Sequence, residues 1–217
     1  MIPIKAVLFD LDGTLLDTAR DVGSALNHLL QEHQQPILPF HVIRSAAGSG
    51  CKGLLKLGMN IDTTDARYPG LCDELLNLYQ RYLVNTTQLF PGMENILLFL
   101  ENQHIPWGIV TNKPAKYTIQ LVEHLKLHQR TSCIISGDSL PNRKPHPEPI
   151  LHACQLLQQQ PKDCLYIGDA EIDIQACKAA GSMALAALYG YIPTTEDPKS
   201  WGADGYIQHP REIMNWL

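Results

Sequence analysis

Near its N-terminus the chain reads Ala6-Val7-Leu8-Phe9-Asp10-Leu11-Asp12-Gly13-Thr14-Leu15. Four apolar residues in succession are typical of a short strand that is covered on both faces of a sheet. Two aspartates separated by one residue follow at the carboxyl end of this predicted strand, where open α/β sheets place their ligands. The alternative interpretation is an acidic turn, in which Asp12 and Gly13 serve only the turn geometry.

The two aspartates need something to balance their charge. If the backbone stays extended beyond Phe9, the carboxylates of Asp10 and Asp12 point the same way, because side chains alternate along a strand. Carboxylates at that spacing raise each other's pKa unless a cation or a hydrogen-bond donor lies between them. A functional interpretation of this segment therefore requires a partner from elsewhere in the chain.

The composition is that of a soluble globular protein: 217 residues, of which 45% are hydrophobic and 18% are charged. A chain of this length can form one domain with a sizeable insertion. The net charge of −5 argues against nucleic acid or an anionic membrane as the main partner. Asp10 and Asp12 interrupt the apolar N-terminal run, so no secretory signal is indicated, and the apolar run at 96–100 is too short to span a membrane. We expect a cytoplasmic protein.

The six cysteines are scattered, and no two form a Cys-x-x-Cys pair. Thiols without metal-ligand spacing are typical of small buried side chains in a reducing compartment, and they do not indicate a zinc site. Nothing in the sequence distinguishes a monomer from a homodimer.

Helical and strand patterns divide the chain into two kinds of region. Between Asp17 and Gln88 apolar residues recur at helical spacing, and no segment has the pattern of a strand. Beyond Pro91-Gly92, predicted helices alternate with predicted strands, as in parallel βαβ units, and these strands lie at 107–110, 133–135, 165–167 and 183–187. The predicted fold is α/β, with a Rossmann-like parallel-sheet core of residues 1–16 and 89–217 and an inserted α-helical cap domain of residues 17–88.

Two further segments carry groups suited to an anion. The predicted strand at 107–110 is followed by Thr111-Asn112-Lys113-Pro114, whose hydroxyl, amide and helix start are suited to a phosphate; helix capping by Thr111 or Asn112 is the alternative. Lys144 lies in Arg143-Lys144-Pro145-His146-Pro147-Glu148-Pro149, where the prolines restrict the backbone. A fixed ammonium group suits a transferring phosphoryl oxygen, whereas an exposed lysine before a helix is the alternative.

The predicted strand at 165–167 runs into Gly168-Asp169-Ala170-Glu171-Ile172-Asp173. Asp169 stands at the end of its strand as Asp10 does, and Asp173 follows four residues later. Asp10, Asp12 and Asp169 would repel one another strongly without a cation between them. Oxygen ligands with no His or Cys nearby favour Mg²⁺. The sequence therefore predicts a Mg²⁺ site.

Four of these motifs occur in an order that resembles the haloacid dehalogenase superfamily, namely Asp10-Leu11-Asp12-Gly13-Thr14, Thr111-Asn112-Lys113, Lys144-Pro145 and Gly168-Asp169-x-x-x-Asp173. The resemblance spans the whole chain. Further segments are similar to the phosphoglycolate phosphatase branch, namely Leu89-Phe90-Pro91-Gly92, Lys144-Pro145-His146-Pro147 and Leu188-Tyr189-Gly190-Tyr191. Trp201-Gly202-Ala203-Asp204 resembles the N-acetylmuramic acid 6-phosphate phosphatases. One departure is Ala170, where relatives commonly carry Ser or Asp, which removes a hydrogen-bonding partner around the metal.

The resemblance implies a phosphatase that acts on a small phosphorylated metabolite, with phosphoglycolate as the first candidate. Asp10 would be the nucleophile that forms an aspartyl-phosphate. Asp12 would protonate the leaving alkoxide and then deprotonate the attacking water. Mg²⁺ would be bound by the carboxylates of Asp10 and Asp169 and by the backbone carbonyl of Asp12, with Asp173 as support.

The same resemblance implies where the substrate binds. Thr111 and Lys144 would hold phosphoryl oxygens, helped by backbone N–H groups near Gly13 and Asn112. The helical insertion would be a cap that closes over the site and excludes competing water.

Arg44 and the Gly48-Ser49-Gly50 loop are the candidates for the face of this cap that recognises the substrate. An arginine at this place would pair with a substrate carboxylate such as that of phosphoglycolate. The alternative for Arg44 is a solvated arginine on a helix.

Three other functions remain open on the sequence. An N-acetylmuramic acid 6-phosphate phosphatase would differ in substrate alone, and a β-phosphoglucomutase-like mutase of the same superfamily would return the phosphoryl group to product instead of to water. A phospho-accepting signalling module that resembles receiver domains also combines acidic residues, Mg²⁺, Thr and Lys on a parallel sheet. The large helical insertion after the first strand counts against this last class.

Overall fold

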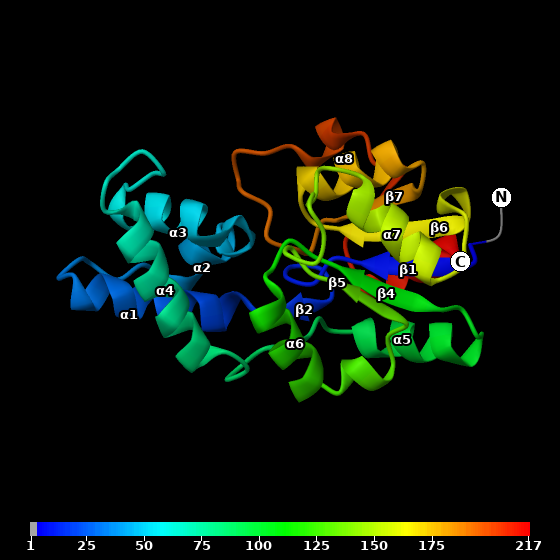
Figure 1. The fold of residues 1–217 in the computed structure, drawn as a ribbon, viewed down its shortest axis with the longest axis horizontal. Coiled ribbons are helices and arrows are strands. Elements are labelled where there is room, and N and C mark those ends of the chain that lie inside the picture. Colours follow the sequence, from blue (N-terminus) through cyan, green and yellow to red (C-terminus); the bar gives the residue numbers. More distant parts are fainter. Residues whose placement is uncertain (1–3) are drawn as a thin grey trace. The chain divides into compact units, whose positions relative to one another are not determined.

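The computed structural model describes residues 4–217, which divide into two compact units (Figure 1). The sheet unit comprises the chain up to Leu16 together with Leu89–Leu217, and the helical unit comprises Asp17–Gln88. Within the described residues, no helix is long and apolar enough to cross a membrane.

The sheet unit is built on six parallel strands in the order β5-β4-β1-β6-β7-β8. Their bounds are β1 Ala6–Phe9, β4 Trp107–Val110, β5 Cys133–Ile135, β6 Cys164–Gly168, β7 Met183–Ala187 and β8 Gly205–Ile207. The predicted α/β class and the strands at 107–110, 133–135, 165–167 and 183–187 are confirmed. The sequence pattern did not indicate β8, because three residues beginning with glycine are too short to show an alternation.

Helices cover both faces of this sheet, with α7 and α8 on one side and α5 and α6 on the other (Figure 1). Their bounds are α5 Met93–Asn102, α6 Ala115–His124, α7 Glu148–Leu156 and α8 Glu171–Ala180. Ala6, Leu8 and Tyr166 face α7 and α8 in one buried cluster that includes Ile150 and Ile174. Because both faces are covered, the central strands β1, β4 and β6 are buried at every residue.

Short 3₁₀ helices complete the sheet unit, namely η2 Leu127–Gln129, η3 Pro161–Asp163, η4 Pro198–Trp201 and η5 Pro210–Trp216. The segment from Pro210 therefore ends the chain as a 3₁₀ helix. The indole of Trp216 packs so closely on Gly205 of β8 that a side chain at Gly205 would overlap it.

The helical unit consists of α1 Ala19–Glu32, α2 Phe40–Arg44, the 3₁₀ helix η1 Ala47–Ser49, α3 Gly50–Met59 and α4 Tyr68–Tyr82. The helices α1 and α4 are its main packed pair. Apolar side chains recur at helical spacing on both, and Leu26 and Leu29 of α1 are fully buried. Where the chain passes between the units, β2 Leu16–Asp17 and β3 Gln88–Leu89 form a separate two-stranded sheet.

Candidate active site

The carboxyl ends of two neighbouring strands bring Asp10 and Asp169 together. Phe9 of β1 pairs with Ile167 of β6, and the N–H of Asp10 donates to the carbonyl of Ile167 at 2.9 Å. Asp10 follows β1 directly, and Asp169 follows β6 directly. Because parallel strands end at the same edge of a sheet, both carboxylates lie at the edge where such folds bind ligands.

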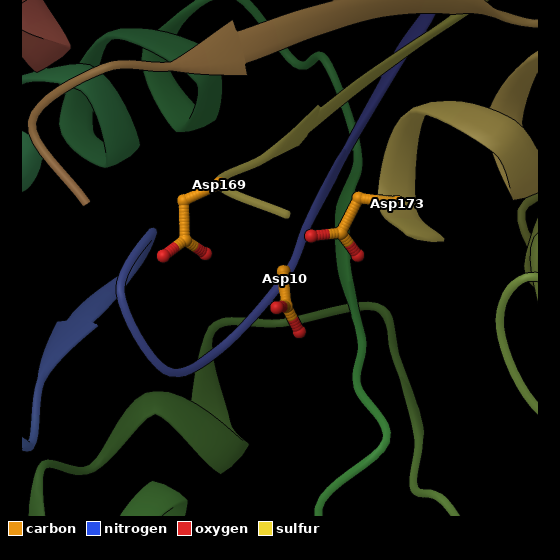
Figure 2. A group of neighbouring side chains, drawn as sticks. All are labelled: Asp10, Asp169 and Asp173. Carbon is orange, nitrogen blue, oxygen red and sulfur yellow. The ribbon is translucent and has the colours of Figure 1, made fainter. Parts of the chain in front are cut away.

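Asp173, in the first turn of α8, completes a group of three carboxylates that are shown together in Figure 2. One oxygen of each carboxylate lies within 4.8 Å of the others. Oδ2 of Asp173 accepts a hydrogen bond from the N–H of Ala170 at 3.0 Å, so the start of α8 fixes this side chain. Ala170 has no polar side chain, and it contributes to the site through its backbone N–H.

Lys144 supplies a buried positive charge to the group. Its Nζ donates to the carbonyl of Val110 at 2.9 Å, to Oη of Tyr166 at 2.8 Å and to Oδ1 of Asp173 at 2.6 Å. The same Nζ lies 2.9 Å from Oδ1 of Asp10. The first three contacts have hydrogen-bond geometry, and the fourth is a close ion pair. Lys144 therefore acts on Asp10 as a fixed point charge.

Burial controls the ionisation of these side chains. It raises the pKa of Asp10 to about 6, although the charge of Lys144 opposes the shift. Burial and the charges of Asp10 and Asp173 raise the pKa of Asp169 well above its ordinary value. Burial lowers the pKa of Lys144, but the charges of Asp10 and Asp173 outweigh burial and raise it, so this lysine stays an ammonium ion.

The residues present fit a divalent cation. Three carboxylates face one ammonium group, which leaves an excess of negative charge. Oδ1 of Asp10 is buried, and its contact with Nζ of Lys144 lacks hydrogen-bond geometry, so the oxygen can still accept a further cation. A group of ligands that are all oxygen suits a hard cation such as Mg²⁺.

The surroundings of Asp169 hold its carboxylate in place. Oδ1 accepts from the hydroxyl of Thr14 at 3.1 Å, and Oδ2 accepts from the N–H of Tyr191 at 2.7 Å. Gly13, with φ of +81°, and Gly190 lie so close that a side chain on either would overlap the Asp169 carboxyl group. The segment around Gly190, which the sequence analysis singled out only by resemblance, is therefore part of the site.

The side chain of Asp12 does not belong to the group of three carboxylates, and it pairs with the ammonium group of Lys113. Both of its carboxylate oxygens lie 3.0 Å from Nζ of Lys113. Its charge still reaches the group of three, because it raises the pKa of Asp10, although less than burial does.

Thr111 and Asn112 lie at the end of β4, as the sequence predicts, but their side chains contact the protein itself. The hydroxyl of Thr111 accepts from the N–H of Lys113 at 3.2 Å. Nδ2 of Asn112 donates to the carbonyl of Lys144 at 2.9 Å, and Oδ1 of Asn112 accepts from the N–H of Lys144 at 3.0 Å. The Asn112 side chain thus fixes the backbone from which Lys144 extends.

The predicted substrate-recognition residues all belong to the helical unit. Arg44 is the last residue of α2 and is half-buried. Gly48 lies in η1, Gly50 begins α3 with φ of +61°, and both are exposed. Their contact with a substrate stays a prediction.

Sequence reasoning gave no role to Tyr166 or to Lys113, whose side chains contact predicted site residues. Tyr166, inside β6, is fully buried, and its hydroxyl lies 3.0 Å from Oδ1 of Asp173 and 3.1 Å from the carbonyl of Val110. A tyrosine in an otherwise apolar buried strand is a signal, because its hydroxyl needs a partner there. Lys113 is the second, and its place beside Thr111 and Asn112 was the only indication.

The chain resembles known proteins over most of its length. The family model described as haloacid dehalogenase-like hydrolase matches residues 7–187. The chain is 40% identical over 209 residues to a phosphoglycolate phosphatase of Xanthomonas campestris pv. campestris, covering 96% of this chain and 94% of the relative. It is 36% identical over 210 residues to an N-acetylmuramic acid 6-phosphate phosphatase of Pseudomonas putida, covering 97% and 94%.

A solved structure shares the fold. The crystal structure of a predicted phosphoglycolate phosphatase from Haemophilus somnus superposes with a TM-score of 0.86 at 25% identity. The superposition covers 98% of this chain and 97% of that one.

Proposed function

The chain belongs to the haloacid dehalogenase-like hydrolase family and is a phosphatase of that family, and from this premise we propose that it is a Mg²⁺-dependent phosphatase of a small metabolite, working through an aspartyl-phosphate on Asp10. The observation that carries the proposal is the meeting of Asp10, Asp169 and Asp173 with the buried Lys144 at the carboxyl edge of the sheet. A purely structural role would leave three carboxylates together without purpose, since their repulsion costs stability.

Charge compensation is the first requirement of the reaction. A phosphomonoester dianion repels the carboxylate of Asp10, and Lys144 opposes that repulsion from 2.9 Å. The carboxylates of Asp10 and Asp169 and the backbone carbonyl of Asp12 would hold Mg²⁺, with Asp173 in support. When bound, Mg²⁺ supplies further positive charge at the phosphoryl oxygens and at Asp10.

The chemical steps then fall to two aspartates. An oxygen of Asp10 forms a bond to phosphorus while the bond from phosphorus to the leaving oxygen breaks, and Asp12 gives a proton to that oxygen. Water next attacks phosphorus and gives a proton to Asp12, and the bond between phosphorus and Asp10 breaks. Inorganic phosphate leaves, and both aspartates return to their starting state.

Thr111 and the N–H groups near Gly13 and Asn112 would hold the phosphoryl oxygens during these steps. The helical unit would act as the cap, with Arg44, Gly48 and Gly50 on its substrate-recognition face.

The substrate we favour is phosphoglycolate, because relatives named phosphoglycolate phosphatase reach 40% identity. N-acetylmuramic acid 6-phosphate is the second candidate, because a relative of that name covers the chain equally well at 36% identity. Both compounds carry a carboxylate, so Arg44 suits either one.

Phosphate release from a panel of compounds tests the proposal. The panel comprises 2-phosphoglycolate, N-acetylmuramic acid 6-phosphate and β-glucose 1-phosphate, each with Mg²⁺ and with a chelator. We expect Mg²⁺-dependent release from one of the first two and none from Asp10→Asn, which should still fold. Consumption of a sugar phosphate without phosphate release would indicate a mutase, and a stable phospho-Asp10 without turnover would indicate a signalling module.

A further inference from the structure

Lys113 makes a two-point contact with Asp12 that the proposed steps do not use. Its Nζ lies 3.0 Å from Oδ1 and 3.0 Å from Oδ2 of that carboxylate. The side chains of Lys113 and Asp12 are only 10% and 16% exposed, so solvent screens the pair less than it screens a surface ion pair.

The backbone of Lys113 is fixed from several sides. Its N–H donates to the hydroxyl of Thr111 at 3.2 Å, and its carbonyl accepts from the N–H of Gly137 at 2.9 Å and from the hydroxyl of Thr118 at 3.2 Å. A side chain at Gly137 would overlap the backbone of Asn112, so the two segments are in close contact. The ammonium group of Lys113 therefore extends from an anchored segment.

We propose that Lys113 is a positioning residue for Asp12. Its ammonium group holds the Asp12 carboxyl group in the orientation from which Asp12 protonates the leaving oxygen. The inference rests on the proposed function, because that function gives Asp12 its proton-transfer role. A carboxyl group turns about its side-chain bonds unless both oxygens are held, and an acid acts only within hydrogen-bond reach of the oxygen it protonates. Among the contacts made by the Asp12 side chain, this ion pair is one that holds both oxygens.

If Lys113 acts through Asp12, its removal should slow only those reactions in which the leaving oxygen needs a proton from Asp12. Phenolate is a poor leaving group and gains from protonation, whereas p-nitrophenolate leaves readily because the nitro group stabilises the anion. Phenyl phosphate and p-nitrophenyl phosphate are otherwise similar in shape and carry no carboxylate. The pair therefore separates the loss of acid catalysis from a loss of fold, metal or phosphate binding, which would slow both reactions alike.

The experiment measures kcat/KM of both aryl phosphates for the unaltered enzyme and for Lys113→Met, because kcat/KM covers the steps up to loss of the aryl oxygen and leaves out the later step in which Asp12 acts as a base. We expect kcat/KM for phenyl phosphate to fall on the order of tenfold, a part of the roughly 100- to 10,000-fold that a general acid contributes. The kcat/KM for p-nitrophenyl phosphate should stay nearly unchanged. Lys113→Arg should restore most of the lost activity, since a guanidinium group also contacts both oxygens of a carboxylate.

Two controls sharpen the result. Lys116→Met removes the same charge from an exposed lysine of α6 and should affect neither substrate selectively. In an Asp12→Asn background, Lys113→Met should cause no further loss with phenyl phosphate, because its target is gone. Should Lys113→Met fail to fold, Lys113→Gln takes its place in every comparison.

Equal losses with both substrates, a faster reaction with phenyl phosphate, or a further loss in the Asp12→Asn background would each overturn the inference and leave the proposed function standing. If the unaltered enzyme releases phosphate from none of these compounds or those of the metabolite panel, the proposed function fails, and this inference fails with it.

Discussion

The ammonium group of Lys144 lies 2.6 Å from Oδ1 of Asp173, and both side chains are almost completely buried. Removing one partner of a buried ion pair leaves the other charge without compensation, and here Asp10 and Asp169 add to the uncompensated charge. We expect Lys144→Met to lower the free energy of unfolding by about 3–5 kcal/mol. It should also slow phosphate release on the order of 100- to 1,000-fold. Urea unfolding without metal and phosphate release with Mg²⁺ measure the two effects.

The matched control is Lys5→Met. Lys5 also forms an ion pair, 2.7 Å from Asp163, but its side chain is 52% exposed. The same substitution there should cost less, about 1–2 kcal/mol, because Lys5 is exposed although Asp163 is buried, and it should leave phosphate release unchanged. Similar destabilisation by both variants would contradict the special role of the Lys144 site.

The raised pKa of Asp10 predicts how Mg²⁺ and protons compete. A carboxyl group whose pKa rises from 3.8 to about 6 on folding binds more protons in the folded state, so its contribution to stability is full below pH 3.8 and is lost as the pH rises through about 6. Mg²⁺ needs the deprotonated group. The stabilisation by saturating Mg²⁺, about 2.7 kcal/mol at 100 times its Kd, should therefore be small at the acidic end of this range and grow as the pH rises above it.

Melting temperatures with and without Mg²⁺, taken at several pH values on both sides of 6, test this competition. Asp10→Asn serves as the control, because it removes both the titrating group and a metal ligand. Its Mg²⁺-dependent shift should be small at every pH. A shift of the unaltered protein that does not change with pH would rule out competition at Asp10.

The site could be predicted from the sequence as far as strand ends could be located. Asp10 and Asp169 each follow an apolar run, and parallel strands end at one edge, so the pattern predicts that both lie at that edge; that β1 and β6 are neighbours is known only from the structure. The register adds a detail that the pattern does not contain: Phe9 pairs with Ile167, so Asp10 lies beside Gly168, one residue before Asp169. The glycine at this place leaves room for the Asp173 carboxyl group.

Side-chain partners could not be predicted in the same way. Lys144 was expected to face a phosphoryl oxygen, yet its N–H groups are directed to Val110, Tyr166 and Asp173. The choice among these partners depends on how the loop that carries Lys144 packs against β4 on one side and against β6 and α8 on the other, and these come from separate parts of the sequence. The pairing of Lys113 with Asp12 is equally non-local, since 101 residues separate the two.

Asp21 provides a prediction for the helical unit, independent of the chemistry. Oδ1 of this buried carboxylate accepts from the N–H and hydroxyl of Thr86, at 2.9 and 2.6 Å, and Oδ2 accepts from the N–H and hydroxyl of Thr87, at 3.1 and 2.7 Å. Asp21→Asn would turn an amide N–H₂ toward donors. We expect a loss of about 2–4 kcal/mol in unfolding free energy, because several charge-assisted hydrogen bonds are lost together. Asp62→Asn, at an exposed carboxylate, should cost much less, and equal losses in urea unfolding would contradict the argument.

Gly190 allows the geometry around Asp169 to be tested without altering any charge. A methyl group at Gly190 would overlap Cβ of Asp169 and meet its Oδ2 and the carbonyl oxygen of Gly13, both at 2.6 Å. Because Asp169 is held there by Thr14 and Tyr191, Gly190→Ala should displace its carboxylate and weaken Mg²⁺ binding about 10- to 100-fold. Gly70→Ala is the control: nothing lies within 4 Å of its added methyl group, and as a residue of α4 it should gain about 0.5–1 kcal/mol. Calorimetric titration with Mg²⁺ measures the affinity, and unchanged binding in Gly190→Ala would show that Asp169 is not a ligand.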